Sequence, residues 1–320
     1  MSGPHVLLTG ANGFVASHIL SILIDRNYTI TATVRSQQKA GDIIRTHPEW
    51  KDKVNFVIVT DFTTAKPFDH LTREMLKSAQ DYGGAELKRF ALLGSAVAVL
   101  NSFQDVTKEG KPYTEKDWNP VTAEQAIERK DGVLGYNVSK TRAEAAAWEF
   151  MKANKPTFDL VVINPDIITG PMMHPISGPK SINETNEFAI GSFIDGTHSK
   201  VEGVTFPFYH FVDVRDVARS HVDALTNPAA ANQRVLLVSG LISPQLVVNA
   251  IREHFPALRD RVPEGTPSQL LPPGVNPTGW DMAVSLDILA KGTKEGKWEY
   301  KSLKTSVVDT VGSMIEHKLI

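Results

Sequence analysis

Tyr136 and Lys140 stand four residues apart and form the clearest candidate pair for proton chemistry. The stretch reads Tyr-Asn-Val-Ser-Lys, and the alanine-rich residues 141–152 that follow it predict a helix. Residues four apart on a helix share a face, so Lys140 can lie beneath the Tyr136 ring. A free tyrosine has a pKa of about 10, and a neighbouring ammonium lowers that pKa toward neutrality. Random helical Tyr–Lys pairs are common, so the spacing alone decides nothing.

Ser95 is a second candidate because of its place in a predicted strand. The apolar run from residue 89 to residue 100 predicts a buried strand, and Ser95 lies toward its carboxyl end. Open α/β sheets bind their ligands at that edge. A serine in a strand is more often a small packing residue, so position alone leaves the role of Ser95 open.

A glycine-rich turn near the start of the chain predicts a phosphate site. Residues 6–8 are Val-Leu-Leu, the pattern of a buried parallel strand, and residues 14–26 have helical spacing. Between them, Gly10 permits a tight turn and Gly13 lets the backbone approach a pyrophosphate at the helix start. Ala16 takes the place of the third glycine in a dinucleotide fingerprint. Such a glycine pattern is weak by itself, but its context of strand, turn and helix strengthens it.

Two basic residues after the second predicted strand indicate which dinucleotide would bind. Residues 28–34 alternate as a strand does, and Arg35 and Lys39 follow where an NAD site usually carries an acidic residue. A guanidinium pairs with a phosphate through two hydrogen bonds, which favours the 2′-phosphate of NADP. The alternative is an ordinary solvated arginine at the start of a loop. Together with the glycine turn, the NADP interpretation is preferred.

The order of the elements predicts an α/β fold, a doubly wound Rossmann domain with a mostly parallel sheet and a small C-terminal lobe. The predicted strand at residues 54–59 ends near Asp61, and later buried strands are expected at 160–164 and 234–239. We expect residues 1–170 to form the NADP-binding domain. Residues 171–320 would form a mixed substrate lobe, in which 211–240 returns to the Rossmann sheet.

Composition excludes several other classes of protein. The 320 residues include 34 basic and 36 acidic side chains, which predicts neither a nucleic acid nor a membrane surface as partner. There is no cysteine, and the ten histidines show no metal-binding spacing, so we predict no disulfide and no metal site. No signal peptide or membrane span is recognisable, and we expect a cytoplasmic protein.

Taken together, these motifs resemble the extended short-chain dehydrogenases/reductases, the superfamily of NAD-dependent epimerases and dehydratases. Within it the chain resembles the fungal NADPH-dependent methylglyoxal, aldehyde and ketone reductases, relatives of dihydroflavonol 4-reductase. The matching motifs run through nearly the whole chain in the family's order: Thr9-Gly-Ala-Asn-Gly-Phe14, Arg35 with Lys39, Asp61, Ser95, Tyr136-x-x-x-Lys140, Asn164-Pro165…Gly170-Pro171 and Val212-Asp-Val-Arg-Asp-Val-Ala218.

The resemblance implies roles for these residues. Tyr136 would protonate the carbonyl oxygen as hydride arrives, Lys140 would lower the tyrosine pKa and bind the nicotinamide ribose, and Ser95 would hold the substrate oxygen. The residues that it implies for NADPH binding are Gly10, Ala11, Asn12, Gly13, Phe14, Val15, Arg35, Lys39, Asp61, Phe62, Tyr136, Lys140, Pro165 and Asp166.

The chain departs from the family's pattern after Asp61. The family has a helix there, then a fourth strand whose turn contacts the cofactor, and then a long helix with a proton-relay asparagine. Here residues 71–82 match only the end of that long helix, so the segment between 62 and 88 is shortened. Either the strand at 89–100 moves beside residues 6–8, or the sheet stays split, because a gap would leave buried backbone groups unpaired.

The sequence therefore predicts an NADPH-dependent carbonyl reductase that transfers hydride to a small aldehyde or ketone. Two rivals stay open: a non-catalytic NADP-binding or interaction protein of the same fold, and a nucleotide-sugar epimerase or dehydratase with the same triad. The physiological substrate and the oligomeric state cannot be deduced from the residues.

Overall fold

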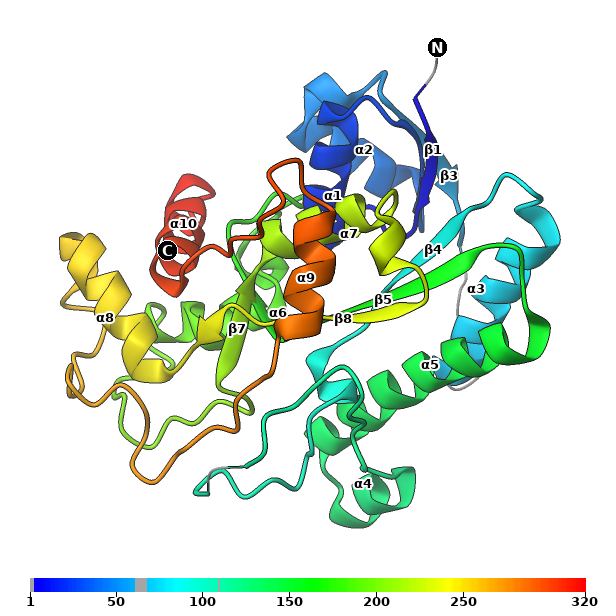
Figure 1. Cartoon of the computed structure of the whole chain (residues 1–320). Helices are drawn as coiled ribbons and strands as arrows, with labels where there is room; N and C mark the ends of the chain where they lie inside the picture. Colours follow the sequence, from blue (N-terminus) through cyan, green and yellow to red (C-terminus); the bar gives the residue numbers. More distant parts are fainter. Residues whose placement is uncertain (1–2, 61–67, 109) are drawn as a thin grey trace.

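Strands and helices alternate along most of the chain in the computed structural model, which describes residues 3–60, 68–108 and 110–320 (Figure 1). The strands are β1 (His5–Leu8), β2 (Thr29–Val34), β3 (Val54–Ile58), β4 (Arg89–Leu93), β5 (Asp159–Pro165), β6 (Ile167–Thr169), β7 (His210–Asp213), β8 (Gln233–Leu237) and β9 (Gly240–Leu241). The helices are α1 (Phe14–Asp25), α2 (Gln37–Thr46), α3 (Phe68–Tyr82), α4 (Ala123–Arg129), α5 (Gly132–Asn154), α6 (Glu184–Ala189), α7 (Val214–Ala224), α8 (Pro244–His254), α9 (Ala283–Lys291) and α10 (Leu303–Glu316).

The described strands form three sheets of three. The first has the order β1-β2-β3 and the second β4-β5-β8, and every pair within them is parallel. The third sheet pairs β6 with β7 in parallel and β7 with β9 antiparallel. Parallel neighbours need crossover connections, and the helices between the strands supply them. The mostly parallel α/β Rossmann fold expected from the sequence is confirmed.

The sheet is split between β1 and β4. Within the described residues β1 pairs only with β2, and β4 pairs only with β5. Of the two arrangements expected from the shortened segment, the structure therefore has the second. The strand that carries Ser95 has not moved across to β1 but keeps its full register with β5, from Arg89 opposite Asp159 to Leu93 opposite Ile163.

Helix α7 packs against both sheets and so connects them across the split. Its Ala218 and Val222 pack in the core of the first sheet with α1. Its Val217 and Ala224 pack in the core of the second sheet with β5 and β8. An ion pair of 2.6 Å between Arg26, at the end of α1, and Asp223 adds to this contact. The first and second sheets are thus joined by side-chain packing on this face.

Several element boundaries differ from expectation for local reasons. β4 ends at Leu93, not near residue 100, because Ser95 caps a short 3₁₀ helix at Ala96–Ala98. α5 begins at Gly132, since Asp131 accepts hydrogen bonds from the first backbone N–H groups, so Tyr136 lies inside the helix. Helices α4 and α9 were not expected.

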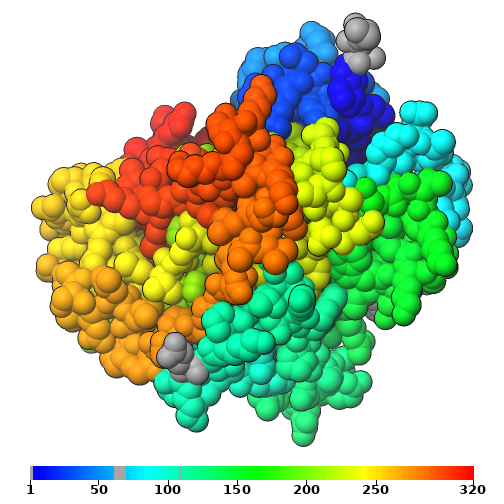
Figure 2. All heavy atoms as spheres, viewed as in Figure 1, coloured from blue at the N-terminus to red at the C-terminus, as the bar shows by residue number. Residues whose placement is uncertain are grey.

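The third sheet has its own hydrophobic core, built by helices from the second half of the chain. α8 and α10 pack together around the core of the third sheet (Figure 1). Val106 and Tyr113 meet residues 276–281 through backbone hydrogen bonds. Figure 2 shows the teal and orange parts of the chain in contact toward the lower edge of the molecule. No helix in the described part of the chain is long and apolar enough to cross a membrane.

Candidate active site

The turn between β1 and α1 has the backbone conformation that a phosphate cradle needs. Gly10 has a φ of +65°, a value that L side chains rarely adopt. The Gly13 N–H donates to the Gly10 carbonyl across 2.9 Å and closes the turn. The Ala11 N–H donates to the Thr33 carbonyl of β2, and the Ala11 side chain is fully buried, so only its backbone could meet a ligand. The sequence thus predicted the turn at the correct residues.

The first turn of α1 is open to an anion. Gly13 is the N-cap residue and provides no side-chain cap, and the first turn contains no acidic residue. Backbone N–H groups at such a helix start carry partial positive charge and can bind a pyrophosphate. Phe14 instead packs against His18 and His174, and the Val15 side chain joins the cores on both sides of α1. Asn12 is partly buried at the tip of the turn.

Arg35 and Lys39 lie where the cofactor's 2′-phosphate is expected. Arg35 follows β2 directly, and both side chains are exposed. Ser36 caps α2 by accepting a hydrogen bond from the Lys39 N–H, so Lys39 is held in the first turn of that helix. That turn contains no acidic residue. The two cations therefore stand beside a second helix start that favours negative charge.

Ser95, Tyr136 and Lys140 come together although they lie on different elements. Ser95 follows β4 and is 8% exposed, and it lies close enough to Tyr136 to influence the pKa of that side chain. The Lys140 Nζ lies 5.6 Å from the centroid of the Tyr136 ring, as the helical spacing predicted. Since β4 keeps its place beside β5, the split in the sheet has not separated Ser95 from Tyr136.

The pKa of Tyr136 is shifted in the direction opposite to expectation. Although the Tyr136 side chain is 49% exposed, its partial burial raises the pKa above the usual value, the nearby Ser95 lowers it in part, and the charge of Glu184 raises it. Lys140, whose Nζ lies 5.6 Å from the ring centroid, does not reverse this shift. Burial also lowers the pKa of Lys140. Tyr136 therefore holds its proton firmly at neutral pH.

A buried polar network lies behind Ser95 and was not foreseen from the sequence. Asn164, at the end of β5, is fully buried; its Oδ1 accepts from the Ser95 N–H across 3.0 Å. Its Nδ2 donates to Glu144 Oε2 of α5 across 3.2 Å. Arg234 of β8 donates through Nε to Glu144 Oε1 across 2.6 Å. Gly94 makes the approach possible, because a Cβ there would lie 2.0 Å from Asn164 Oδ1.

Arg234 is fixed by more than its ion pair. Its Nη1 donates to the carbonyls of Glu115 and Asp117, and its guanidinium lies 4.0 Å from the centroid of the Trp118 ring. Arg234 and Glu144 are 8% and 1% exposed. This network connects the loop before α4, helix α5 and strands β5 and β8 to the backbone of Ser95.

Of the remaining residues predicted to bind the cofactor, the structure describes two and leaves two undescribed. Pro165 ends β5, and Asp166 follows it at the carboxyl edge of the sheet. Asp166 is 7% exposed and accepts a hydrogen bond from the Ile167 N–H, and burial raises its pKa to about 7. Asp61 and Phe62 lie outside the described residues.

An open hollow lies beyond the Ser95 turn, in the loop that leads to α4. Its volume is about 290 Å³, and it is lined by Val99, Asn101, Gln104, Lys111, Pro112, Tyr113, Asp117, Trp118 and Pro120. The Asn101 N–H donates to the Tyr113 hydroxyl at its wall. Arg234 stacks on one of its lining residues, Trp118, and so connects the hollow with the network behind Ser95.

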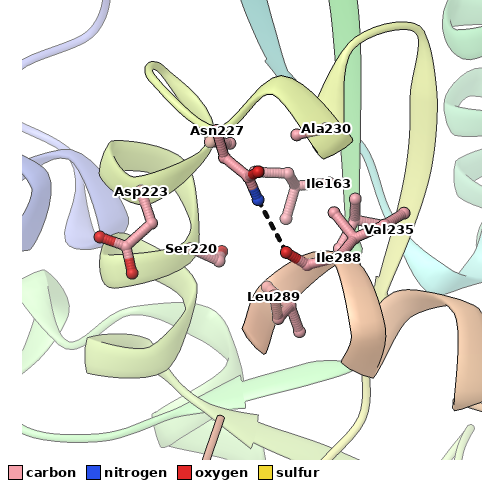
Figure 3. A pocket seen from close by; sticks show the side chains of 9 residues that line it. Ile163, Ser220, Asp223, Asn227, Ala230, Val235, Ile288 and Leu289 are labelled. Atoms are coloured by element: carbon pink, nitrogen blue, oxygen red, sulfur yellow. Dashed lines mark hydrogen bonds between the residues drawn. The ribbon is translucent and has the colours of Figure 1, made fainter. Parts of the chain in front are cut away.

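A second cavity is too small to be a substrate site. It holds about 10 Å³ between β5, β8, α7 and α9. Figure 3 shows its mostly apolar wall and the hydrogen bond of 2.7 Å from Asn227 Nδ2 to the Ile288 carbonyl. A space of this size has room for about one water molecule. It is a packing void.

Comparison with known proteins finds relatives that align with most of the chain. The chain is 35% identical to an uncharacterised oxidoreductase of Schizosaccharomyces pombe, over 82% of this chain and 86% of that one. It is 30% identical to a Candida albicans protein named for NADPH-dependent methylglyoxal reduction, over 98% and 99%. The structure of Gre2 from Candida albicans with NADPH superposes with a TM-score of 0.80 at 26% identity, over 98% and 99%. The chain matches no protein-family profile.

Proposed function

The chain belongs to the fungal NADPH-dependent methylglyoxal, aldehyde and ketone reductases, within the extended short-chain dehydrogenases/reductases, and we propose that it reduces a small aldehyde or ketone at Ser95, Tyr136 and Lys140. The observation that carries this assignment is the placement of Lys140 Nζ 5.6 Å from the centroid of the Tyr136 ring, with Ser95 close enough to the same tyrosine to influence its pKa. This arrangement places a proton donor and a second hydroxyl at one point of the sheet edge.

NADPH supplies the hydride when it is bound, and the chain's own residues supply the proton. Tyr136 is protonated at neutral pH, because the usual pKa of tyrosine, about 10, is already well above 7 and partial burial raises it further. It can therefore donate its proton to the carbonyl oxygen, which becomes the hydroxyl of the alcohol product. Ser95 donates a hydrogen bond to the same oxygen and orients it. Lys140 stabilises the phenolate that is left and binds the nicotinamide ribose.

The residues around the glycine turn fit NADPH. The open start of α1 accepts the pyrophosphate, and Gly10 and Gly13 keep side chains out of its way. Arg35 and Lys39 provide positive charge for the 2′-phosphate. We propose that residues 1–170 carry these contacts, that residues 171–320 complete the substrate side, and that the protein works in the cytoplasm.

The test is a Tyr136→Phe variant assayed for NADPH oxidation with a panel of small aldehydes and ketones that includes methylglyoxal. Only the transferable proton is lost, so turnover should fall by about a hundredfold or more while the NADPH dissociation constant stays unchanged. The matched control is Tyr82→Phe, since Tyr82 is 87% exposed on α3 and should keep full activity. Retention of most of the activity in Tyr136→Phe would refute the assignment.

A further inference from the structure

The strands on the two sides of the split each have one bonded edge. β1 makes its ladder with β2, from His5 opposite Thr29 to Leu8 opposite Ala32. β4 makes its ladder with β5. A strand in a parallel sheet directs half of its backbone N–H and C=O groups to each side. In the part of the chain that the structure describes, no strand pairs with the second edge of either. Both edges are therefore templates for another strand.

Apolar side chains are exposed on both of these strands. Leu7 in β1 is 62% exposed and Leu93 in β4 is 38% exposed. By contrast, β5 has a partner on each side and is buried from residue 160 to residue 165. Val6 and Leu8 pack toward α1, so Leu7 points to the opposite face. An occupant of the gap would lie beside apolar side chains of β1 on both faces of the sheet, which favours a continuous apolar run over an alternating one.

The relatives carry residues that this chain lacks. The alignment with the Candida albicans relative spans 352 residues and covers 99% of it, whereas this chain has 320 residues. The same fold is nevertheless built on both sides of the split, and α7 packs on both halves. The relative thus has residues with no counterpart in this chain, while the elements on both sides of the split are present here.

We propose that the gap between β1 and β4 is a docking site for one extended strand of another polypeptide, bound parallel to both edges. The occupant is a run of four or five apolar, mostly β-branched residues, matching the lengths of β1 and β4. Main-chain hydrogen bonds to both edges give the affinity, as in other cases of strand addition. Proline is excluded from the middle of the run because it cannot donate to the ladder.

The docked strand would also act on the reaction, and in this respect the inference rests on the proposed function. The Gly10 turn follows β1, and Ser95 follows β4. The spacing of the cofactor cradle and the catalytic set across the split is held by α7 on one face. A strand bonded to both edges fixes that spacing directly, so it should increase turnover as well as stability.

The experiment uses the full chain and a fluorescent peptide with the core Val-Ile-Val-Val-Ile between lysine flanks. A peptide with proline at the central position is the control probe. Fluorescence anisotropy should show saturable binding of the first peptide and at least about tenfold weaker binding of the second. Hydrogen exchange should slow at the amides of residues 6–8 and 90–93 when the first peptide binds. Equal binding of both peptides, or no binding of either, would overturn the proposal.

Two protein variants complete the test. Leu7→Glu should weaken peptide binding by about tenfold or more, because it puts a charge beside the apolar run, and it should fold normally since Leu7 is exposed. Ile127→Glu, at a position 74% exposed on α4, should bind as the wild type does. Equal binding by all three proteins would contradict the assigned site. Peptide binding together with a complete lack of NADPH oxidation would count against the proposed function but not against the docking site.

Discussion

The backbone N–H of Ser95 donates to the side-chain Oδ1 of Asn164 across 3.0 Å, and both residues are buried. The position of the serine hydroxyl thus depends on a side chain of the next strand. Asn164 in turn depends on Glu144, and Glu144 on Arg234. The placement of Ser95 against Tyr136 is therefore set by a chain of contacts that reaches from β4 to β8.

Asn164→Ala should impair turnover more than cofactor binding. The substitution leaves the Ser95 N–H without its acceptor and lets the Ser95 turn shift, and small displacements of a catalytic group can lower a rate by about a hundredfold. We expect kcat to fall by at least about tenfold, with little change in the NADPH dissociation constant. The control is Asn154→Ala, at an exposed position near the end of α5. An unchanged kcat would show that Asn164 does not position Ser95.

Arg234→Met should destabilise the fold strongly because it leaves the Glu144 carboxylate buried and unpaired. Breaking a buried pair from one side typically costs about 3–5 kcal/mol. Chemical denaturation should therefore give a lower free energy of unfolding. The double variant with Glu144→Leu should recover part of the loss, since it removes the orphaned charge. As a control, Lys291→Ala breaks the exposed ion pair with Asp287 and should change stability by less than about 0.5 kcal/mol.

Arg35→Ala should weaken NADPH binding and leave NADH binding almost unchanged. The 2′-phosphate distinguishes the two cofactors, and a lost charge-assisted contact costs about 1.5–3 kcal/mol, or at least about tenfold in the dissociation constant. Titration of cofactor fluorescence measures both constants. Arg45→Ala, near the other end of α2, is the control. Equal affinities for NADPH and NADH in the wild type would remove this role from Arg35.

Asp166→Asn should change how stability depends on pH. The pKa of Asp166 rises from 3.8 to about 7 on folding because of burial, so the folded state binds the extra proton between these values. The stabilisation from this proton is fully present below pH 3.8 and is lost as pH rises through about 7. Relative to the variant, the wild type should lose up to about 1.4 kcal/mol per pH unit within this window. Denaturant unfolding of both proteins at pH 5 and pH 8 measures the difference, and parallel curves would contradict it.

The parts of the site that are local in sequence could be predicted, and those that are distant could not. The Gly10 turn and the approach of Lys140 to Tyr136 follow from spacings of a few residues, which a helix or turn converts directly into distances. The bonds from Asn164 to Ser95 and from Arg234 to Glu144 join residues 69 and 90 positions apart. No local pattern specifies such a pairing, because it depends on which strands become neighbours.

Some differences did have a signal in the sequence. Thr122 and Gln125 form a capping box at the start of α4, a spacing that indicates a helix start. The raised pKa of Tyr136 had no signal in the sequence. Its direction depends on partial burial of the side chain and on the charge of Glu184, which lies on the distant helix α6. Partial burial of a side chain is a property of the assembled fold.

The strands differ in how many neighbours they pair with, so their backbone amides should open to solvent at different rates. β5 has ladders on both sides and a buried face throughout, so its amides should exchange with solvent only when the whole protein unfolds. β1 has one ladder of four residues, and its amides can be released by fraying of that short segment. The Gly10 turn, the proposed cofactor cradle, thus follows the strand with the shorter ladder of its sheet, whereas Asn164 lies on a strand with ladders on both sides. Cofactor affinity should accordingly respond to temperature well before the arrangement around Ser95 does.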